Sequence, residues 1–502
     1  MDISMVRRIT VPIQLLMLMA VVFLLQACAI NPVTNRRELM LVSEDREFGI
    51  GQSVDKQVRE EMGIYLEKPE LTSLLKKTVE NIGKKSHRPD LIYRAEIVDT
   101  PDFNAFAVPG GFVYVHRGLL ERINSVDELA SIMGHEIGHV SARHSASQMT
   151  KQQLFNIGVL GASLFTGGEI QKFGDLVNMG SILTFSKFSR DDEREADYLG
   201  IRYMVDAGFN PNGAIEAMKT IKRINDREPG SLETWFMTHP PTSERLTSLT
   251  NELNILSSKN PEILRRNIKR NEFIRLLDGM AVGEYNGKEL VKGDKYYNKE
   301  FPLSIVIPSG WEVHINSKDY AAIFADTVNK AYTLFNIEPL KKLISTNEYF
   351  DSIVKALESK GLKRETVSLK LQKLSHGALL TGFTGNTNNG PVYVKLAAFV
   401  RGDMGYSFLE VREKASSDSS AYTFNSIING LDFLTQAETL KIEPARMKIH
   451  PIKRGETWDS IMVMYYGRKD DKAKLAEYNG FTVNEMPAPG VLLKIPPTLR
   501  FK

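Results

Sequence analysis

The chain has 502 residues, of which 25% are charged and 42% hydrophobic, and its formal net charge is +3. This length predicts about two to four domains, and the near balance of charge argues against a nucleic-acid partner. Cys28 is the only cysteine in the sequence, which excludes an intramolecular disulfide framework.

The first 28 residues have the pattern of a lipoprotein signal peptide. Two arginines precede an apolar stretch at residues 11–25, which is short for a membrane span. The segment 25–28 resembles a bacterial lipobox, and this resemblance implies cleavage before Cys28 and lipid attachment to it. Ala29 follows in place of the aspartate that retains enterobacterial lipoproteins at the inner membrane. We therefore expect an anchor on the periplasmic side of the outer membrane, with an uncleaved amino-terminal anchor as the alternative.

The next part of the chain shows two helical patterns followed by two alternating patterns typical of strands. They cover residues 44–65, 70–85, 93–98 and 111–115. Residues 104–108 lie between the two expected strands, where an edge strand could bind an extended peptide by adding it to the sheet. An ordinary core hairpin is the alternative, and the sequence does not decide between them.

The clearest motif is His135-Glu136-Ile137-Gly138-His139, on a helix that Ser125 is expected to begin with a capping box. His135 and His139 are four residues apart, so both rings project from one side of the helix. Glu136 is rotated by about 100°, which places it beside a metal ion held by the two rings. This arrangement is typical of a zinc hydrolase. Two histidines packed in a polar helix face are the alternative.

A second helix, expected from residue 190 to 207, carries Glu193 and Asp197 on one face. Glu193 would complete a set of two histidines and one glutamate, and Asp197 could accept the other ring N–H of a ligand histidine. An acidic, solvated helix surface is the alternative. In the first helix, Gly134 and Gly138 each cost about 1 kcal/mol relative to alanine, which predicts that another backbone passes close by.

Residues 154–188, between the two helices, are apolar and rich in glycine. A membrane-facing hairpin, a mobile flap and a buried core all fit this composition. Glu169, Lys172 and Asp175 interrupt the apolar run and argue against a membrane span.

These motifs together resemble the zinc metallopeptidases of the HtpX and CAAX-prenyl-protease kind, in which an HExxH helix precedes an ExxxD helix. The resemblance covers residues 30 to 255. It includes four further segments: Asn104-Ala105-Phe106, Pro109-Gly110-Gly111, Arg143-His144 and 238–245, which reads THPPTSER. With the lipobox, the chain looks like the periplasmic lipoprotein branch of this family.

The resemblance implies one zinc ion per chain. His135, His139 and Glu193 would be its ligands, Glu136 the general base, and Asp197 a partner of the ligands. A metalloendopeptidase is the activity that this implies.

The resemblance also implies how substrate is bound. Asn104, Phe106 and Gly111 would contact an extended peptide, and His239 would lie near the metal. There His239 would either stabilise the oxyanion during catalysis or occupy the open metal position in a resting state. The expected substrates are unfolded or misassembled envelope proteins, and the outer-membrane assembly machinery is a further expected partner.

The carboxy-terminal half predicts two accessory domains. Residues 256–300 are polar and are expected to form a linker with some helix. Residues 301–440 predict a separate α+β domain that begins with a hairpin of strands at 301–307 and 311–315. This domain loosely resembles PsbP-like domains and has no constellation of titratable groups, so a binding or spacer role is expected.

Residues 446–498 resemble a LysM-like module. The matching segments are 453–458, Tyr478-Asn479-Gly480, Pro489-Gly490 and Lys494-Ile495-Pro496. LysM modules usually bind polymers of N-acetylglucosamine, so peptidoglycan is a candidate partner. Glu456 stands where aspartate is usual, and the chain holds one copy, so a degenerate structural module is the alternative.

The sequence therefore predicts an α+β architecture of four parts. They are a signal peptide (1–28), a mainly helical zincin metallopeptidase domain with a small β-sheet (29–255), an α+β domain (301–440) and a small LysM-like module (446–498). The predicted protein is a lipid-anchored zinc endopeptidase of the bacterial envelope. A chaperone-like outer-membrane assembly factor with latent protease activity and a peptidoglycan-binding scaffold are the alternatives.

Overall fold

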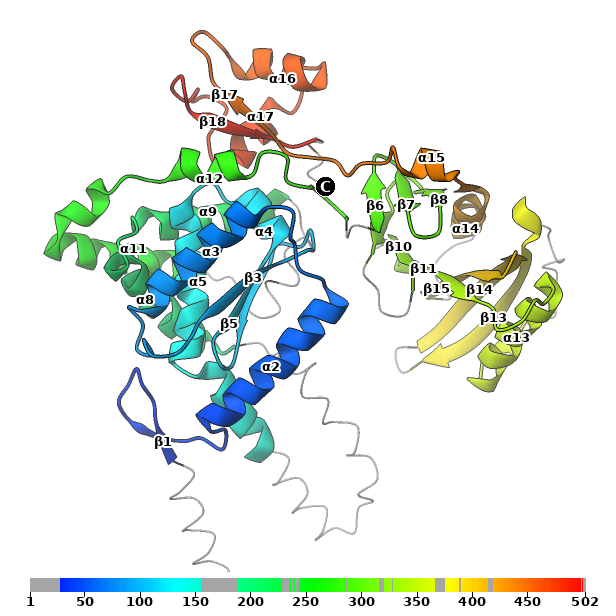
Figure 1. Ribbon diagram of the computed structural model, residues 1–502, viewed down its shortest axis with the longest axis horizontal. Helices are drawn as coiled ribbons and strands as arrows, with labels where there is room; N and C mark the ends of the chain where they lie inside the picture. The colour runs from blue at the N-terminus through cyan, green and yellow to red at the C-terminus, as the bar shows by residue number, and fades with distance from the viewer. Residues whose placement is uncertain are drawn as a thin grey trace, which may run out of the picture.

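The computed structural model shows a helical domain around a small sheet, an α+β domain and a small carboxy-terminal module (Figure 1). The residues that it describes are 28–154, 188–227, 235, 239, 243–285, 288–315, 320–326, 328–365, 375–387, 390–413, 419–497 and 499. The expected signal peptide up to residue 27 and the interior of the glycine-rich segment lie outside them. Among the described residues, no helix combines the length and apolarity that crossing a bilayer requires.

The small sheet of the first domain has the strand order β3-β5-β4. β3 (Arg94–Val98) pairs in parallel with β5 (Phe112–His116), and β4 (Ala105–Val108) pairs with β5 in antiparallel orientation. Both strands expected from the alternation, at 93–98 and 111–115, are thus confirmed within one residue. β4 forms a hairpin with β5 and is also an edge of the described sheet, so the two alternatives for residues 104–108 do not exclude each other.

Helices surround this sheet and share an apolar core with it, except the first, which packs through Val54 and Val58 on a second, smaller cluster. Their bounds are α2 (Glu44–Glu61), α3 (Pro69–Gly83), α4 (Arg117–Arg122), α5 (Val126–Ser141), α8 (Arg190–Asp206), α9 (Asn212–Arg227), α11 (Ser243–Lys259), the 3₁₀ helix η3 (Pro261–Arg265) and α12 (Arg270–Leu276). A two-stranded sheet of β1 (Cys28–Ile30) and β2 (Arg37–Leu39) precedes them. Ser125 caps α5 by accepting from the backbone N–H of Glu128, which is one half of the predicted capping box, whereas the Glu128 carboxylate accepts from the backbone of Asn124.

α5 and α8 pack closely because small residues lie where they meet, Gly134 against Gly200 and Gly138 against Ala196. A Cβ added to Gly134 would lie 2.7 Å from the carbonyl oxygen of Gly200, and one added to Gly138 would lie 2.9 Å from that of Ala196. The close backbone approach predicted from the two glycines is therefore confirmed. It brings the side chains of both helices to one site.

The α+β domain contains two antiparallel sheets. The four-stranded sheet is β16-β8-β7-β6, formed by β6 (Glu289–Lys292), β7 (Lys295–Asn298), β8 (Leu303–Val306) and β16 (Leu431–Phe433). The seven-stranded sheet is β12-β13-β14-β15-β11-β10-β9, formed by β9 (Glu312–His314), β10 (Ala322–Asp326), β11 (Ala331–Pro339), β12 (Lys363–Arg364), β13 (Leu379–Thr387), β14 (Gly390–Arg401) and β15 (Met404–Glu413). Its helices are α13 (Thr346–Ser359) and α14 (Ser419–Asn429), and α15 (Gln436–Thr439) follows it.

Two expectations for this half differ from the structure. The hairpin expected at 301–315 is wrong, because β8 pairs with β7 and β16 whereas β9 pairs with β10 in the other sheet. The alternation correctly marks buried faces, but the partners of both strands are set by the fold and not by the intervening turn. The linker expected at 256–300 holds the end of α11, η3, α12 and the strands β6 and β7.

The carboxy-terminal module has the order strand, helix, helix, strand. Its elements are β17 (Lys448–Pro451), α16 (Trp458–Tyr466), α17 (Lys472–Tyr478) and β18 (Leu492–Ile495). The two strands pair with each other, and the residues beneath them form a small core around Trp458 and Ile461. Figure 1 shows β18 and α17 on the side that faces the first domain, with α16 farther from it.

Candidate metal centre

Four buried side chains converge from three segments of the first domain. His135 and His139 come from α5, Glu193 from the first turn of α8, and His239 from the segment before α11. One ligand-type atom from each of the four lies within 4.8 Å of the other three. The structure thus brings together the three predicted ligands and also His239.

The spacing of these atoms fits a tetrahedral zinc ion. Four ligand atoms about 2.0–2.1 Å from zinc would lie about 3.3 Å from one another. His135 Nε2 lies 3.1 Å from His139 Nε2 and 3.3 Å from His239 Nδ1. Glu193 Oε1 lies 2.9 Å from His239 Nδ1 and 3.4 Å from His139 Nε2. The donor set of three imidazoles and one carboxylate also suits zinc.

Partners on the far side of both rings fix which nitrogen faces the cluster. His135 Nδ1 lies 2.9 Å from Asp197 Oδ1, so the structure places Asp197 where the sequence predicts. His139 Nδ1 lies 2.9 Å from His144 Nδ1, and His144 Nε2 lies 3.0 Å from Glu195 Oε2. With Nδ1 used in this way, each ring presents the Nε2 lone pair to the cluster.

Arg245, in the first turn of α11, joins the carboxylates of the site. Its guanidinium donates to both oxygens of Asp197 at 2.7 Å and lies 2.8 Å from Glu193 Oε2. Burial opposes ionisation of Asp197, yet Arg245 and His135 lower its pKa to about 2. Burial raises the pKa of Glu193, but His239 foremost, with His139 and His135, holds it far below its usual range. Both carboxylates are therefore anionic, as a cation site requires.

Glu136 lies beside the cluster, where its rotation on α5 predicts it. Its Oε1 is 3.5 Å from His239 Nε2, and its carboxylate accepts a hydrogen bond from the backbone of Ala107 in β4. Burial raises the pKa of Glu136, and His239 and His135 oppose that rise. A carboxylate with a raised pKa that is held next to the edge strand is suited to accept and return a proton.

Aromatic rings enclose the cluster. Phe188 stacks on His139 with a centroid separation of 4.0 Å, and Trp235 lies 4.7 Å from His239. Trp235 in turn meets Phe103 edge to face at 5.9 Å. These rings exclude water from the ligands, which strengthens electrostatic interactions at the site.

The three residues predicted to bind substrate occupy different surroundings. Asn104 is buried just before β4, and its side-chain oxygen has no hydrogen-bond partner among the described residues. Phe106 is half-buried in β4 and stacks on Tyr114 at 4.9 Å. Gly111 has φ +86° and approaches Ile92 so closely that a Cβ would lie 2.8 Å from its carbonyl oxygen. Backbone geometry explains this glycine, and the binding of substrate by all three stays a prediction.

The sequence alone assigns no role to Arg245, His144, Glu195, Phe188 or Trp235. Arg245 and His144 did carry a signal, because both belong to segments of the family resemblance. Arg245 makes its contacts because α11 returns to α8, 48 residues after Asp197, and His144 because the turn that ends α5 places it beside His139. Phe188 and Trp235 carried no signal beyond being aromatic.

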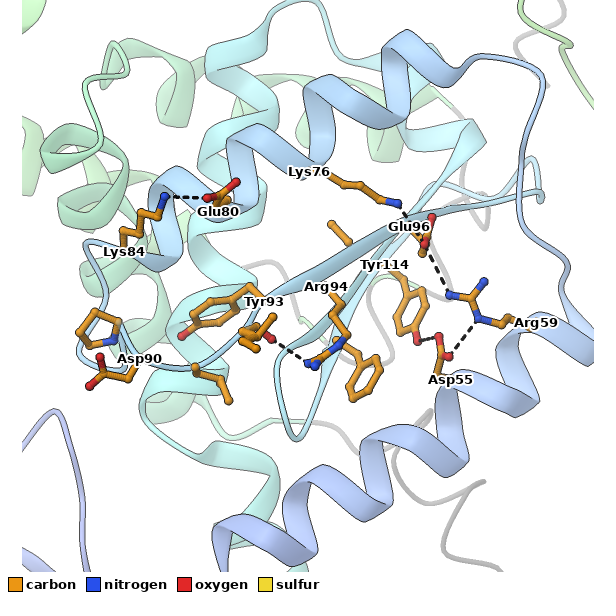
Figure 2. A pocket seen from close by; sticks show the side chains of 15 residues that line it. Asp55, Arg59, Lys76, Glu80, Lys84, Asp90, Tyr93, Arg94, Glu96 and Tyr114 are labelled. Carbon is orange, nitrogen blue, oxygen red and sulfur yellow. Dashed lines mark hydrogen bonds and ion pairs between the residues drawn. The ribbon is translucent and has the colours of Figure 1, made fainter.

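A separate groove of about 570 Å³ lies along β3, between α2 and α3 (Figure 2). Its charged side chains pair with one another: Asp55 with Arg59 at 2.9 Å, Lys76 with Glu96 at 3.2 Å, and Glu80 with Lys84 at 2.6 Å. Arg94 lies over the rings of Phe48 and Phe112. This groove holds no convergent set of metal ligands or catalytic groups.

The buried cluster has the donor set of a metal centre. Residues 66–253 of the chain match the model of the family described as Peptidase family M48. The mitochondrial metalloendopeptidase OMA1 of Schizosaccharomyces pombe is 32% identical over 225 residues, which cover 43% of this chain and 64% of that protein. These similarities support a metalloendopeptidase.

Bacterial relatives extend the similarity. The beta-barrel assembly-enhancing protease of Yersinia pestis is 24% identical over 430 residues, covering 71% of this chain and 86% of that protein. Its namesake from Escherichia coli (strain K12) is 30% identical over 202 residues, covering 38% of this chain and 39% of that protein. The chain spans 64% and 40% of the lengths of the OMA1 proteins of Schizosaccharomyces pombe and Arabidopsis thaliana.

One similarity to a solved structure is weak. The match to the solution structure of cyanobacterial PsbP from Synechocystis sp. PCC 6803 covers 30% of this chain and 98% of the PsbP chain, at 11% identity and a TM-score of 0.23. A score this low carries no argument about the fold, so the PsbP-like resemblance stays a prediction.

Proposed function

We propose that this protein is a zinc-dependent endopeptidase of the bacterial cell envelope, acting on misfolded or misassembled envelope and outer-membrane proteins. The observation that carries the proposal is the buried cluster of His135, His139, Glu193 and His239, whose spacing fits one zinc ion. The names of the relatives, metalloendopeptidase and beta-barrel assembly-enhancing protease, support the reaction and the cellular setting.

In the proposed reaction, a zinc ion held by His135, His139 and Glu193 would supply Lewis acidity toward the scissile carbonyl and the attacking water. Glu136 takes the proton from that water and passes it to the leaving amine. Asp197 and His144 keep the rings of His135 and His139 turned toward the cluster. The free edge of β4 binds the peptide in extended form, next to Glu136.

His239 is proposed to act as a resting-state ligand. Its Nδ1 lies among the ligand atoms, at the position that a hydrolytic site leaves to water. In this proposal His239 must leave before water and peptide enter. The competing role is that of a fixed oxyanion donor, and His239→Ala separates the two. Activity on casein should rise if His239 blocks the site, and should fall about a hundredfold with unchanged zinc content if it is the donor.

The central experiment compares the wild type with Glu136→Gln, using metal analysis and a casein cleavage assay with and without a chelator. We expect one zinc per chain in both proteins, chelator-sensitive cleavage by the wild type, and no cleavage by the variant. Glu136 touches no ligand atom at bonding distance, so its loss should spare the metal. Undiminished cleavage by Glu136→Gln, or zinc-free wild type with full activity, would contradict the proposal.

Membrane attachment through a lipid on Cys28 completes the proposal. Cys28 opens β1, immediately before the folded domain. Cys28→Ala should release the protein from membranes without loss of peptidase activity. Intact-mass analysis that finds an unmodified Cys28 would contradict lipidation.

A chaperone-like assembly factor with latent protease activity is the second candidate. It is favoured by the extent of the similarity to the Yersinia pestis relative, which reaches beyond the residues that match the peptidase family model. Full complementation of a deletion strain by Glu136→Gln would favour this candidate. A peptidoglycan-binding scaffold is the third, and sedimentation of the full chain with isolated peptidoglycan would test it.

A further inference from the structure

The carboxy-terminal module contacts the first domain through a buried lysine. Lys494, in β18, is completely buried, and its Nζ donates to the carbonyl oxygens of Glu121, Arg122 and Ile123 at 2.8, 3.1 and 2.8 Å. These carbonyls belong to the end of α4 and to the turn that leads into α5. Ser125, the cap of α5, follows two residues later.

The chemistry of this contact is favourable for a lysine. The last carbonyls of a helix have no partner within the helix and carry partial negative charge, and an ammonium group offers three donors. Burial lowers the pKa of Lys494, whereas Glu128 and Glu121 oppose that effect. The three acceptors at hydrogen-bonding distance favour the ammonium form.

Further contacts tie the module to the same corner. The hydroxyl of Tyr478 donates to Glu121 at 2.8 Å. Asn271 of α12 accepts from the backbone of Leu492 and donates to that of Gly490, both at 3.0 Å. Tyr478 and Leu492 are also part of the apolar core of the first domain, together with Leu119 and Leu129.

The chain path explains how the module reaches this position. Gly279 N–H donates to Met447 O at 2.8 Å, Met447 N–H to Met280 O at 2.9 Å, and Val282 N–H to Ala445 O at 2.8 Å. The chain therefore leaves the first domain for the α+β domain and returns from it at adjacent points. Figure 1 shows the returning segment passing beside α12 into the module.

We propose that the carboxy-terminal module is a positioning part of the peptidase domain, in which Lys494 fixes the corner between α4 and α5 and thereby the direction of the metal-binding helix. The positioning of α5 does not depend on the proposed peptidase function; only its expected effect on peptide hydrolysis rests on that proposal. Ser125 and His135 are ten residues apart, or about 15 Å along a helix, so a tilt at the cap displaces both ligand histidines. The module would serve the peptidase whether or not it also binds glycan.

Deletion of the carboxy-terminal module would not be a clean test of glycan binding. Removing residues 446–502 would uncover the apolar core beside Leu119 and take the Lys494 donor from three carbonyls, of which, among the described residues, only that of Arg122 keeps a bond, from the side chain of Asn124. Loss of function after such a deletion would therefore follow from damage to the peptidase, and would not identify a glycan-binding role. Point variants in the full chain separate the two roles.

The test compares three full-length variants by hydrogen exchange and by binding of cobalt(II), whose visible spectrum reports ligand geometry. Lys494→Met removes the ammonium group, and Tyr478→Phe removes one hydroxyl. Lys472→Met, which breaks an exposed ion pair with Asp459 at 2.8 Å in the same module, is the matched control. We expect Lys494→Met to accelerate exchange across residues 119–130 about tenfold or more and to weaken cobalt binding about tenfold. Tyr478→Phe should show a smaller change in the same region, which keeps the test open if Lys494→Met does not fold.

Exchange and cobalt spectra of Lys494→Met and Tyr478→Phe that match those of Lys472→Met would overturn the inference. A change confined to residues 446–499 would overturn it as well. Neither readout needs peptide hydrolysis, so a wild type that binds cobalt but cleaves nothing would contradict the proposed function and leave this test intact.

Discussion

Two groups of charged side chains lie near opposite edges of one three-stranded sheet, and they differ mainly in burial. At the metal centre, the side chains of His135, His139, Glu193, His239 and Arg245 are 1–7% exposed. In the groove along β3, the paired side chains are 21–62% exposed. Exposed pairs contribute about 0–1 kcal/mol, whereas removing one partner of a buried pair costs about 3–5 kcal/mol. Similar ion pairs should therefore matter very differently to this protein.

The largest effect is expected for Glu193→Ala. Glu193 supplies the only carboxylate of the four-residue cluster, and its loss removes one of the two carboxylates that pair with Arg245. We expect loss of bound zinc and of peptide hydrolysis, measured by metal analysis after dialysis and by casein cleavage. Asp191→Ala, an exposed position on the same helix turn, is the control and should keep both. Retention of a full equivalent of zinc by Glu193→Ala would show that the three histidines suffice.

Arg245→Leu should have the next largest effect, because Arg245 bonds to both Asp197 and Glu193 while touching no histidine of the cluster. We expect zinc affinity to fall about 10- to 100-fold and the free energy of unfolding to fall by about 3–5 kcal/mol. Competition with a zinc chelator and denaturant titration measure these quantities. Arg194→Leu breaks an exposed pair between the same two helices, Arg194 with Glu244 at 3.1 Å, and should cost less than about 1 kcal/mol.

Most residues of the metal centre could be predicted from local sequence patterns. Helical spacing is a local property, so it placed His135, His139 and Glu136 on α5 and Glu193 and Asp197 on α8. The cap at Ser125 and the flanking glycines are local signals too, and the Ser125 half of the capping box and the close backbone approach are confirmed. The family resemblance added the order of the two helices and pointed to His239.

What the sequence did not predict depends on long-range packing. Arg245 reaches Asp197 only because α11 returns to α8, and Lys494 reaches the corner before α5 only because the chain comes back after the α+β domain. The expected hairpin at 301–315 failed for the same reason, since strand alternation reports a buried face without naming the partner strand. These contacts cannot be predicted from the order of motifs along the chain.

A third prediction tests close packing in place of charge. Gly134→Ala should destabilise the protein, because the added Cβ would lie 2.7 Å from the backbone of Gly200 and would push α5 from α8. Overpacking of this kind costs about 1–3 kcal/mol, more than the gain of about 1 kcal/mol from helix propensity. Gly49→Ala in α2 is the matched control, since nothing lies within 4 Å of the added atom. Thermal unfolding should show a lower Tm for Gly134→Ala and a higher Tm for Gly49→Ala.

The smallest effect is expected in the groove, for Asp55→Asn. Asp55 accepts hydrogen bonds from Arg59 at 2.9 Å and Tyr114 at 2.7 Å (Figure 2). Burial raises its pKa, but these two bonds outweigh burial and lower the pKa below its ordinary value of 3.8. A lowered pKa in the folded state stabilises the protein above the ordinary pKa, and this contribution is lost as the pH falls through the lowered value. At pH 7 we expect Asp55→Asn to cost no more than about 1 kcal/mol, and less at high salt.

The pH dependence of unfolding stability tests whether the Asp55 carboxylate acts through its charge. Stability of the wild type and of Asp55→Asn, measured by denaturant titration, should differ at neutral pH and converge as the pH falls below the ordinary pKa of aspartate. Asparagine keeps the size and one acceptor oxygen, which can still accept from Tyr114, so the difference reports the charge together with the bond from Arg59. If Asp55→Asn cost as much as Arg245→Leu, burial would not be what separates the two groups of ion pairs. A small, salt-sensitive and acid-sensitive cost would instead mark the groove pairs as surface interactions, with the essential charges confined to the metal centre.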